Sequence, residues 1–204
     1  MVFYMISLVY RKDGSSLDFL LAVIHPKTEV VVLSIDGSFA ARMSSTGLPP
    51  SVRQGSVDVV RFWEQKGYLI VYITGRPEMQ LQKVKSWLYE YKFPRGMLSF
   101  ADSYAPDPLG HKAYYLRNLI KKHEVVVCAA YSNSKDIGIY SSINLKPEQI
   151  FILGEVSRKQ RALVDALGED YRQHLDKLKS SGIHKPHTLA PECINFNDNS
   201  SYNL

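Results

Sequence analysis

Residues 30–39 read VVVLSIDGSF, an unbroken apolar run that passes directly into a polar turn. An apolar run without alternation predicts a strand buried on both faces, as in a parallel sheet covered by helices. Four more short apolar runs follow, at 69–73, 97–100, 125–130 and 150–153. The pattern therefore predicts an α/β domain with a doubly wound, Rossmann-like parallel sheet.

The stretches between these runs have the spacing of amphipathic helices. Apolar residues recur at helical intervals in 81–91 and again in 113–120. A third stretch, 57–66, stops at Gly67, which is typical of a helix that is closed by a glycine. These segments are expected to be the helices that connect the strands.

The N-terminal region has a different pattern. Residues 2–10 and 18–24 are β-rich runs on either side of Asp13-Gly14, a strong signal for a tight turn. Residues 1–28 are therefore expected to form a short β-hairpin that precedes the main domain.

The main domain is expected to span 29–179, with a last helix that includes Leu178. The chain has 204 residues, enough for one well-buried domain with added elements and too few for two domains of ordinary size. Residues 180–204 are polar and aperiodic, which predicts a mobile C-terminal tail.

The overall charge is modestly positive. The chain carries 25 Lys and Arg residues against 20 Asp and Glu residues, a net charge of +5 that favours phosphate groups or anionic membranes as partners. Basic and aromatic residues are not repeatedly interleaved, so nucleic acid is not expected as a partner. The pattern does not decide the oligomeric state.

The cysteines and the apolar runs bear on the cellular compartment. Cys128 and Cys193 have no spacing that suggests a disulfide framework or a zinc site, and Cys128 is expected to be an inert buried thiol. No apolar run is long enough for a spanning helix, and the N-terminus lacks a secretory pattern. A reducing, cytoplasmic location is therefore expected.

Polar residues follow the strands at the positions where a parallel sheet binds ligands, the carboxyl ends of its strands. They are residues 34–38, the tripeptide Thr74-Gly75-Arg76, Lys112 at a helix start, and residues 132–136. Taken singly, each is equally typical of a turn, a solvated lysine or a helix cap. Their order, each after the appropriate element, indicates a binding site.

In this order the four segments resemble the motifs of the haloacid-dehalogenase superfamily, over about residues 30–154. The resemblance implies that Asp36 corresponds to the aspartate that acts as acid and base. It further implies that Thr74 and Lys112 correspond to the hydroxyl and the lysine that hold phosphoryl oxygens.

The sequence departs from that family at two positions. Ser34 stands in the place of the nucleophilic aspartate, and Ser132 in the place of an acidic or amide metal ligand. Serine is a poor nucleophile without an activating base, so a pseudophosphatase and not an enzyme is expected. No cofactor is expected beyond Mg²⁺ held weakly by Asp36 and Asp136.

Five longer stretches narrow the resemblance: VVVLSIDGSF, YLIVYITGRPEMQ, VKSWLYEYKFPRG, DPLGHKAYYL and SKDIGIYSSINL. They are similar to the lipin-type C-terminal domain of membrane-associated phosphatidylinositol transfer proteins, the retinal degeneration B or Nir family. The resemblance implies a non-catalytic domain that binds phosphatidic acid in an anionic membrane. It also implies a peripheral location at the plasma membrane or at its contacts with the endoplasmic reticulum.

The predicted site has a head-group part and a membrane part. The phosphate or lipid head group is expected to bind Ser34, Asp36, Gly37, Ser38, Thr74, Gly75, Arg76 and Lys112. Membrane contacts are expected at Leu48, beside Pro49 and Pro50, and at Arg158, Lys159 and Arg161. Arg76 has the alternative role of supporting the loop before Pro77, and the basic cluster 158–161 that of a solvated helix face.

Two other functions fit the same motifs. One is a magnesium-dependent phosphatidate phosphatase with residual activity, which works through Ser34 or through a water held by Asp36. The other is a protein-interaction domain with a vestigial site. An open positive pocket between the loop 34–38 and Lys112 favours the lipid, whereas bulky side chains in that space oppose it.

Overall fold

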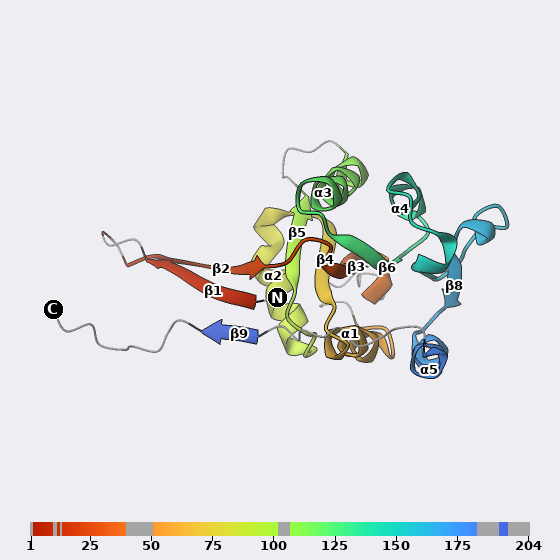
Figure 1. Cartoon of the computed structure of the whole chain (residues 1–204), viewed down its shortest axis with the longest axis horizontal. Helices are drawn as coiled ribbons and strands as arrows, with labels where there is room; N and C mark the ends of the chain where they lie inside the picture. The colour runs from red at the N-terminus through yellow and green to blue at the C-terminus, as the bar shows by residue number, and fades with distance from the viewer. Residues whose placement is uncertain are drawn as a thin grey trace.

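The centre of the fold is a six-stranded sheet with the order β5-β4-β3-β6-β7-β8 (Figure 1). The computed structural model describes residues 2–9, 12, 14–39, 51–101, 107–182 and 192–195. The strands of this sheet are β3 (Glu29–Ser34), β4 (Leu69–Pro77), β5 (Met97–Ala101), β6 (Val126–Ser132), β7 (Ile150–Leu153) and β8 (Asp165–Gly168). Every pairing between them is parallel, which confirms the predicted doubly wound sheet.

Helices cover both faces of the sheet. They are α1 (Ser56–Gln65), α2 (Leu81–Glu90), α3 (Pro108–Lys122), α4 (Ile137–Ser142) and α5 (Arg172–Ser181), with 3₁₀ turns at Glu78–Gln80, Pro147–Gln149 and Arg161–Leu163. Apolar residues of α1, α2 and α5 share one core cluster, and those of α3 and α4 share the other. Figure 1 shows α3 and α4 above the sheet and α1 and α5 below it. Within the described part of the chain, no helix has the length and apolarity needed to cross a bilayer.

The central strand β3 explains the unbroken apolar run. Val31 and Leu33 belong to the cluster under α1, and Val30 and Val32 belong to the cluster under α3. All four side chains are buried, because successive residues of a strand point to opposite faces. The apolar run ends at the carboxyl end of β3, where Ser34 leads into the polar loop.

The helix α1 ends as its sequence predicts. Gly67 has a φ of 85°, a left-handed conformation that glycine adopts without steric cost. The Gly67 N–H donates to the Glu64 carbonyl at 2.8 Å, and the Tyr68 N–H donates to the Trp63 carbonyl at 3.1 Å. These two bonds form a Schellman motif, which satisfies carbonyls at the end of the helix.

Two elements of the main domain are absent from the sequence prediction. The strand β8 has the sequence DALG, with alternating exposure and no apolar run to mark it. The helix α4 has six residues, too few for a clear helical period. Cys128 is a free thiol that is half-buried and not fully buried as expected, and burial together with the charge of Glu29 raises its pKa to about 12.

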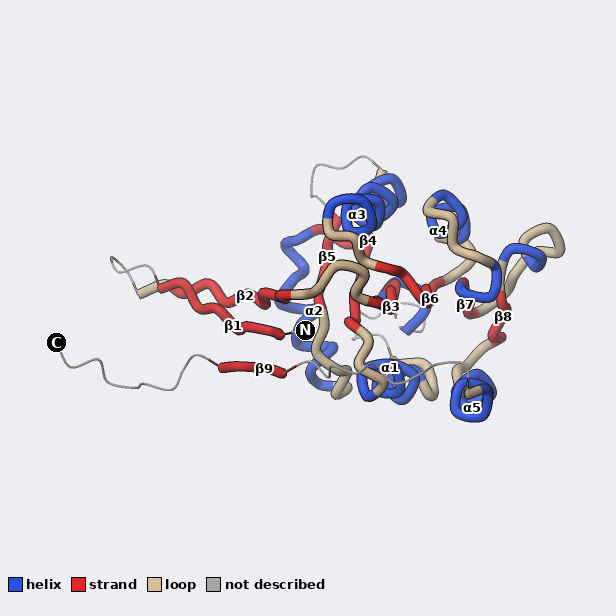
Figure 2. Tube along the Cα trace, in the orientation of Figure 1, coloured by secondary structure: helices blue, strands red, loops and turns tan. Residues whose placement is uncertain are grey.

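A second sheet lies beside the main domain, with the order β2-β1-β9. The strands β1 (Val2–Val9) and β2 (Ser16–Val23) pair antiparallel as the predicted hairpin, and Figure 2 shows them extending away from the six-stranded sheet. β9 (Glu192–Asn195) pairs parallel with β1. The expected boundary at 180 cuts α5, which ends at Ser181, and the four residues of β9 form a strand within the segment expected to be a mobile tail. Their polar sequence hides the strand because its pairing partner lies at the other end of the chain.

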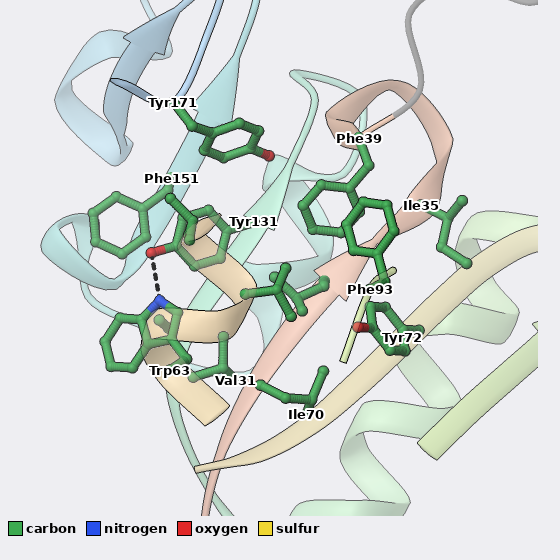
Figure 3. Close-up of a cluster of buried hydrophobic side chains, with 14 of the residues drawn as sticks. Val31, Ile35, Phe39, Trp63, Ile70, Tyr72, Phe93, Tyr131, Phe151 and Tyr171 are labelled. Atoms are coloured by element: carbon green, nitrogen blue, oxygen red, sulfur yellow. Dashed lines mark hydrogen bonds between the residues drawn. The ribbon is translucent and has the colours of Figure 1, made fainter. Parts of the chain in front are cut away.

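A buried polar contact joins α1, β6 and α5 inside the larger core, and Figure 3 shows its part between Trp63 and Tyr131. The Trp63 indole N–H donates to the Tyr131 hydroxyl at 2.8 Å, and that hydroxyl lies 2.8 Å from His174 Nε2. All three side chains are buried, and burial raises the pKa of Tyr131 well above its usual value. A neutral hydroxyl therefore connects three elements of the core.

Replacing Tyr131 by phenylalanine tests this contact. Tyr131→Phe removes the hydroxyl oxygen that contacts the Trp63 indole nitrogen and His174 Nε2. The free energy of unfolding should therefore fall by about 1–3 kcal/mol. Urea denaturation followed by circular dichroism measures the change. Tyr89→Phe, at an exposed position of α2, is the matched control and should stay within about 0.5 kcal/mol of the wild type. Equal effects of the two substitutions would contradict the assignment.

Candidate functional site

The loop after β3 is fixed against the loop after β6. Gly37 has a φ of 80°, and a Cβ atom placed there would lie 2.5 Å from Nδ2 of Asn133. That Nδ2 donates to the Asp36 carbonyl at 2.6 Å. Glycine at position 37 is thus required twice, for its backbone conformation and for the close approach of Asn133. As a result, the segments 34–38 and 132–136 meet at the carboxyl edge of the sheet.

The inner part of the site is a buried network around one oxygen of Asp136. Its Oδ2 accepts hydrogen bonds from Ser34 Oγ at 2.9 Å, Ser132 Oγ at 2.5 Å and Lys112 Nζ at 2.9 Å. Lys112 Nζ also donates to Ser34 Oγ at 3.1 Å. The side chains of Lys112 and Asp136 are only 5% and 2% exposed. This ion pair is therefore shielded from water and from salt.

The outer part of the site is organised around Asp36. Its Oδ2 accepts from Thr74 Oγ1 and from the Gly75 N–H, both at 2.8 Å. Its Oδ1 accepts from Arg76 Nε at 3.0 Å. Here the pair is partly exposed, with 21% for the Arg76 side chain and 32% for that of Asp36. Solvent reaches this half of the site and not the inner half.

The four charges of the two networks balance. Asp36 and Asp136 are matched by Arg76 and Lys112, and Ser34 adds no charge. An aspartate at position 34 would add a third carboxylate beside Asp136. Two like charges 4 Å apart repel by about 4 kcal/mol at an effective dielectric constant near 20. Serine therefore keeps the site neutral in the absence of any metal ion.

The structure brings all eight predicted head-group residues to the carboxyl edge of the sheet. Ser38 is the exception in orientation, because its buried hydroxyl donates back to the Ser34 carbonyl and shapes the loop. Arg76 supports its own loop, since it pairs with Asp36. Asn133 is a site residue that the sequence analysis left unnamed, although it lies inside the 132–136 motif.

The structure does not have the open positive pocket that was expected between the loop 34–38 and Lys112. The space around Ser34 holds the polar groups of Ser132, Asp136 and Lys112. Lys112 lies within the network and its charge is balanced by Asp136, so it does not face an open positive pocket. The cation that solvent reaches is Arg76. Tyr140 lies behind the network, and burial together with the charge of Asp136 raises its pKa well above the usual value.

The predicted basic membrane residues lie on one segment. Arg158, Lys159 and Arg161 are exposed in the connection between β7 and β8. Gln160 Nε2 in the same segment donates to the Ser134 carbonyl at 3.3 Å, which places it against the 132–136 loop. Leu48, with Pro49 and Pro50, lies outside the described residues.

The carboxylates of the site do not fit a bound Mg²⁺. Both oxygens of Asp36 and Oδ2 of Asp136 already accept bonds from N–H and O–H donors, and one donor to Asp136 is an ammonium group. Mg²⁺ requires oxygen ligands in near-octahedral geometry. Among the described residues, no three His, Cys, Asp or Glu side chains are grouped closely enough to hold a metal ion. This arrangement does not match the expected weak Mg²⁺ site at Asp36 and Asp136.

The strand order and the polar site at its carboxyl edge define the chain as a doubly wound α/β domain. A family model described as "PITM 1-3, LNS2 domain" matches residues 31–154, and the chain belongs to this family. The match covers the central strand, all four site segments and β7.

Several relatives match over most of the chain. The protein retinal degeneration B of Drosophila melanogaster is 49% identical over 90% of this chain and 14% of its own length. The human membrane-associated phosphatidylinositol transfer protein 2 is 46% identical over 90% of this chain and 14% of its own length. Among solved structures, a chain of the Pnkp1/Rnl/Hen1 RNA repair complex aligns with a TM-score of 0.47 at 13% identity, over 78% of this chain and 50% of that one. The chain spans about one seventh of the length of the two named relatives.

Breaking the buried Lys112–Asp136 ion pair should strongly lower the stability of the domain. Lys112→Ala leaves Asp136 as a buried carboxylate without its cation, which should lower the free energy of unfolding by about 3–5 kcal/mol. Chemical denaturation measures the loss, with Lys121→Ala at an exposed position of the same helix as the control. The double variant Lys112→Met with Asp136→Asn removes both charges and should recover much of the stability. A double variant as unstable as Lys112→Ala would contradict the ion pair as the cause.

Proposed function

We propose that this domain binds phosphatidic acid at the surface of an anionic membrane and does not hydrolyse it. The observation that carries the proposal is the Arg76–Asp36 pair at the carboxyl edge of the sheet, because it leaves a cation within reach of solvent and of a phosphate. Behind it, Lys112 and Ser34 occupy the position where the related phosphatases have their nucleophile. Membership in the LNS2 family of membrane-associated phosphatidylinositol transfer proteins supports the same reading.

Phosphatidic acid suits the site because its phosphate is a monoester. Such a phosphate carries a charge of about −1.5 to −2 near neutral pH and offers three acceptor oxygens. Arg76 is the cation that contacts the head group first, because its partly exposed pair with Asp36 is worth only about 0–1 kcal/mol and exchanges easily. Lys112 lies behind it, with its charge balanced by Asp136. A neutral site accepts the phosphate without the repulsion that a third carboxylate would add.

Hydrolysis lacks a nucleophile with a working base. The Ser34 hydroxyl donates to Asp136 Oδ2, and that oxygen is already occupied by two further donors, Ser132 and Lys112. Asp36 is turned toward Thr74 and Arg76, so its carboxylate is not free to activate a water. The arrangement therefore favours retention of the phosphate over its transfer.

Membrane attachment adds contacts around the head-group site. Arg158, Lys159 and Arg161 are exposed beside the 132–136 loop, and each basic residue near an anionic surface contributes about 1 kcal/mol. The domain would act as a peripheral membrane module on the cytoplasmic side. The plasma membrane, or its contacts with the endoplasmic reticulum, is the proposed location.

Vesicle binding by an Arg76 variant tests head-group recognition. The wild type should bind phosphatidylcholine vesicles more tightly when phosphatidic acid is added, and phosphatidylserine at equal surface charge should not replace it. Arg76→Ala should weaken this binding about 10- to 100-fold, because a charge-assisted bond is worth about 1.5–3 kcal/mol. Arg172→Ala, an exposed arginine of α5, is the control. Binding that is indifferent to phosphatidic acid would favour a protein-interaction domain instead.

Restoring the carboxylate at position 34 tests the role of the neutral site. Ser34→Asp should lower the affinity for phosphatidic acid vesicles about tenfold or more, through repulsion of the phosphate. Ser34→Ala keeps the site neutral, removes one hydroxyl and should have a smaller effect. Phosphate release from soluble dihexanoyl phosphatidic acid is measured in parallel with Mg²⁺ present. Release by the wild-type protein would show an active phosphatase and contradict the proposal.

A further inference from the structure

Two exposed apolar side chains stand beside the head-group site. The Met79 side chain is 84% exposed and lies three residues after Arg76, at the end of β4. Leu109 is 43% exposed and lies one helical turn before Lys112, at the start of α3. Each therefore belongs to a segment that also supplies a cation of the site.

The two segments are neighbours in space as well. Glu78 and His111 both line one groove of about 880 Å³ that runs along β5. The Glu78–Gln80 turn follows β4 and α3 follows the neighbouring strand β5, so both begin at the carboxyl edge of the sheet. Asp36 and Arg76, which solvent reaches, lie at the same edge.

We infer that Met79 and Leu109 enter the hydrocarbon of the bilayer when the domain docks. Single exposed apolar residues are common on protein surfaces and carry no meaning alone. These two differ in position, because they lie beside the one partly exposed ion pair of the site. The basic residues Arg158, Lys159 and Arg161 follow β7 at the same edge and suit an anionic surface. An apolar pair beside basic residues fits a lipid surface, and this inference rests on the proposed binding of phosphatidic acid.

The geometry explains how a bilayer lipid would reach a site at the edge of a sheet. Phosphatidic acid keeps its acyl chains in the bilayer, so its phosphate is offered at the membrane surface. Inserted Met79 and Leu109 side chains hold the carboxyl edge against that surface and bring Arg76 to the depth of the phosphate. The insertion therefore contributes to vesicle binding and not to recognition of the phosphate itself.

Neutral serine substitutions separate the two contributions. Met79→Ser and Leu109→Ser should each weaken binding to phosphatidylcholine vesicles containing phosphatidic acid by about tenfold. Each substitution removes an apolar side chain that the bilayer would bury on docking. Calorimetry with soluble dihexanoyl phosphatidic acid should give the same affinity as the wild type. Val126→Ser is the matched control, since Val126 is also 43% exposed but lies at the start of β6, on the opposite edge of the sheet.

A fluorescent reporter gives an independent readout of depth. Tryptophan emission in Met79→Trp should shift to the blue on vesicle binding and be quenched by bromine-labelled lipid. The native Trp63 and Trp87 are buried and give a constant background. Val126→Trp should show neither change.

Each outcome decides between the two proposals. Loss of vesicle binding with unchanged binding of the soluble lipid supports insertion. Full vesicle binding by both serine variants, or an unchanged Met79→Trp spectrum, overturns insertion and leaves head-group recognition standing. Failure of the wild-type protein to bind the soluble lipid or the vesicles overturns the proposed function and the inserted residues with it.

Discussion

Oδ2 of Asp136 is the atom on which the carboxyl edge of this fold depends. It accepts hydrogen bonds from Ser34 at the end of β3, from Ser132 at the end of β6 and from Lys112 in α3. A carboxylate removed from water is costly unless its lone pairs are satisfied and its charge is paired. Three elements must therefore be in their native places together before the buried charge is compensated. The same requirement fixes the Ser34 hydroxyl between a carboxylate and an ammonium.

Much of the fold is readable from the sequence because the sheet is buried on both faces. Val30 to Leu33 face two cores, so the central strand appears as an apolar run that no surface strand would have. Edge elements lack that signal. β8 alternates between partly buried and exposed residues over only four positions, and β9 is recognisable only through β1, which lies almost the whole chain away. Local patterns predict elements that are stabilised locally or buried completely, and they miss those that depend on a distant partner.

The sequence predicts which residues gather at the carboxyl edge of the sheet, but it does not predict which cation pairs with which carboxylate. The order of four polar segments after successive strands identified Asp36, Thr74, Lys112 and Asp136, because the strands of a parallel sheet bring their carboxyl ends to one edge. Which cation meets which carboxylate depends on side-chain geometry across that edge. Lys112 was expected to face the ligand, yet it is buried against Asp136, and Arg76 has the exposed position instead. Asn133 escaped notice because its role is to touch a backbone carbonyl that sequence does not reveal.

The parallel pairing of β9 with β1 has a consequence for the order of folding. β1 and β2 form a local hairpin, whereas the contact of Val2 with Glu192 closes a loop that contains the whole main domain. Contacts between residues so distant in sequence form slowly, because the entropy of closing the loop is lost before the contact is gained. During synthesis, the pairing of β1 with β9 must wait until residue 192 has emerged. This pairing is thus a late step, and until it forms that edge of β1 can pair with a wrong strand.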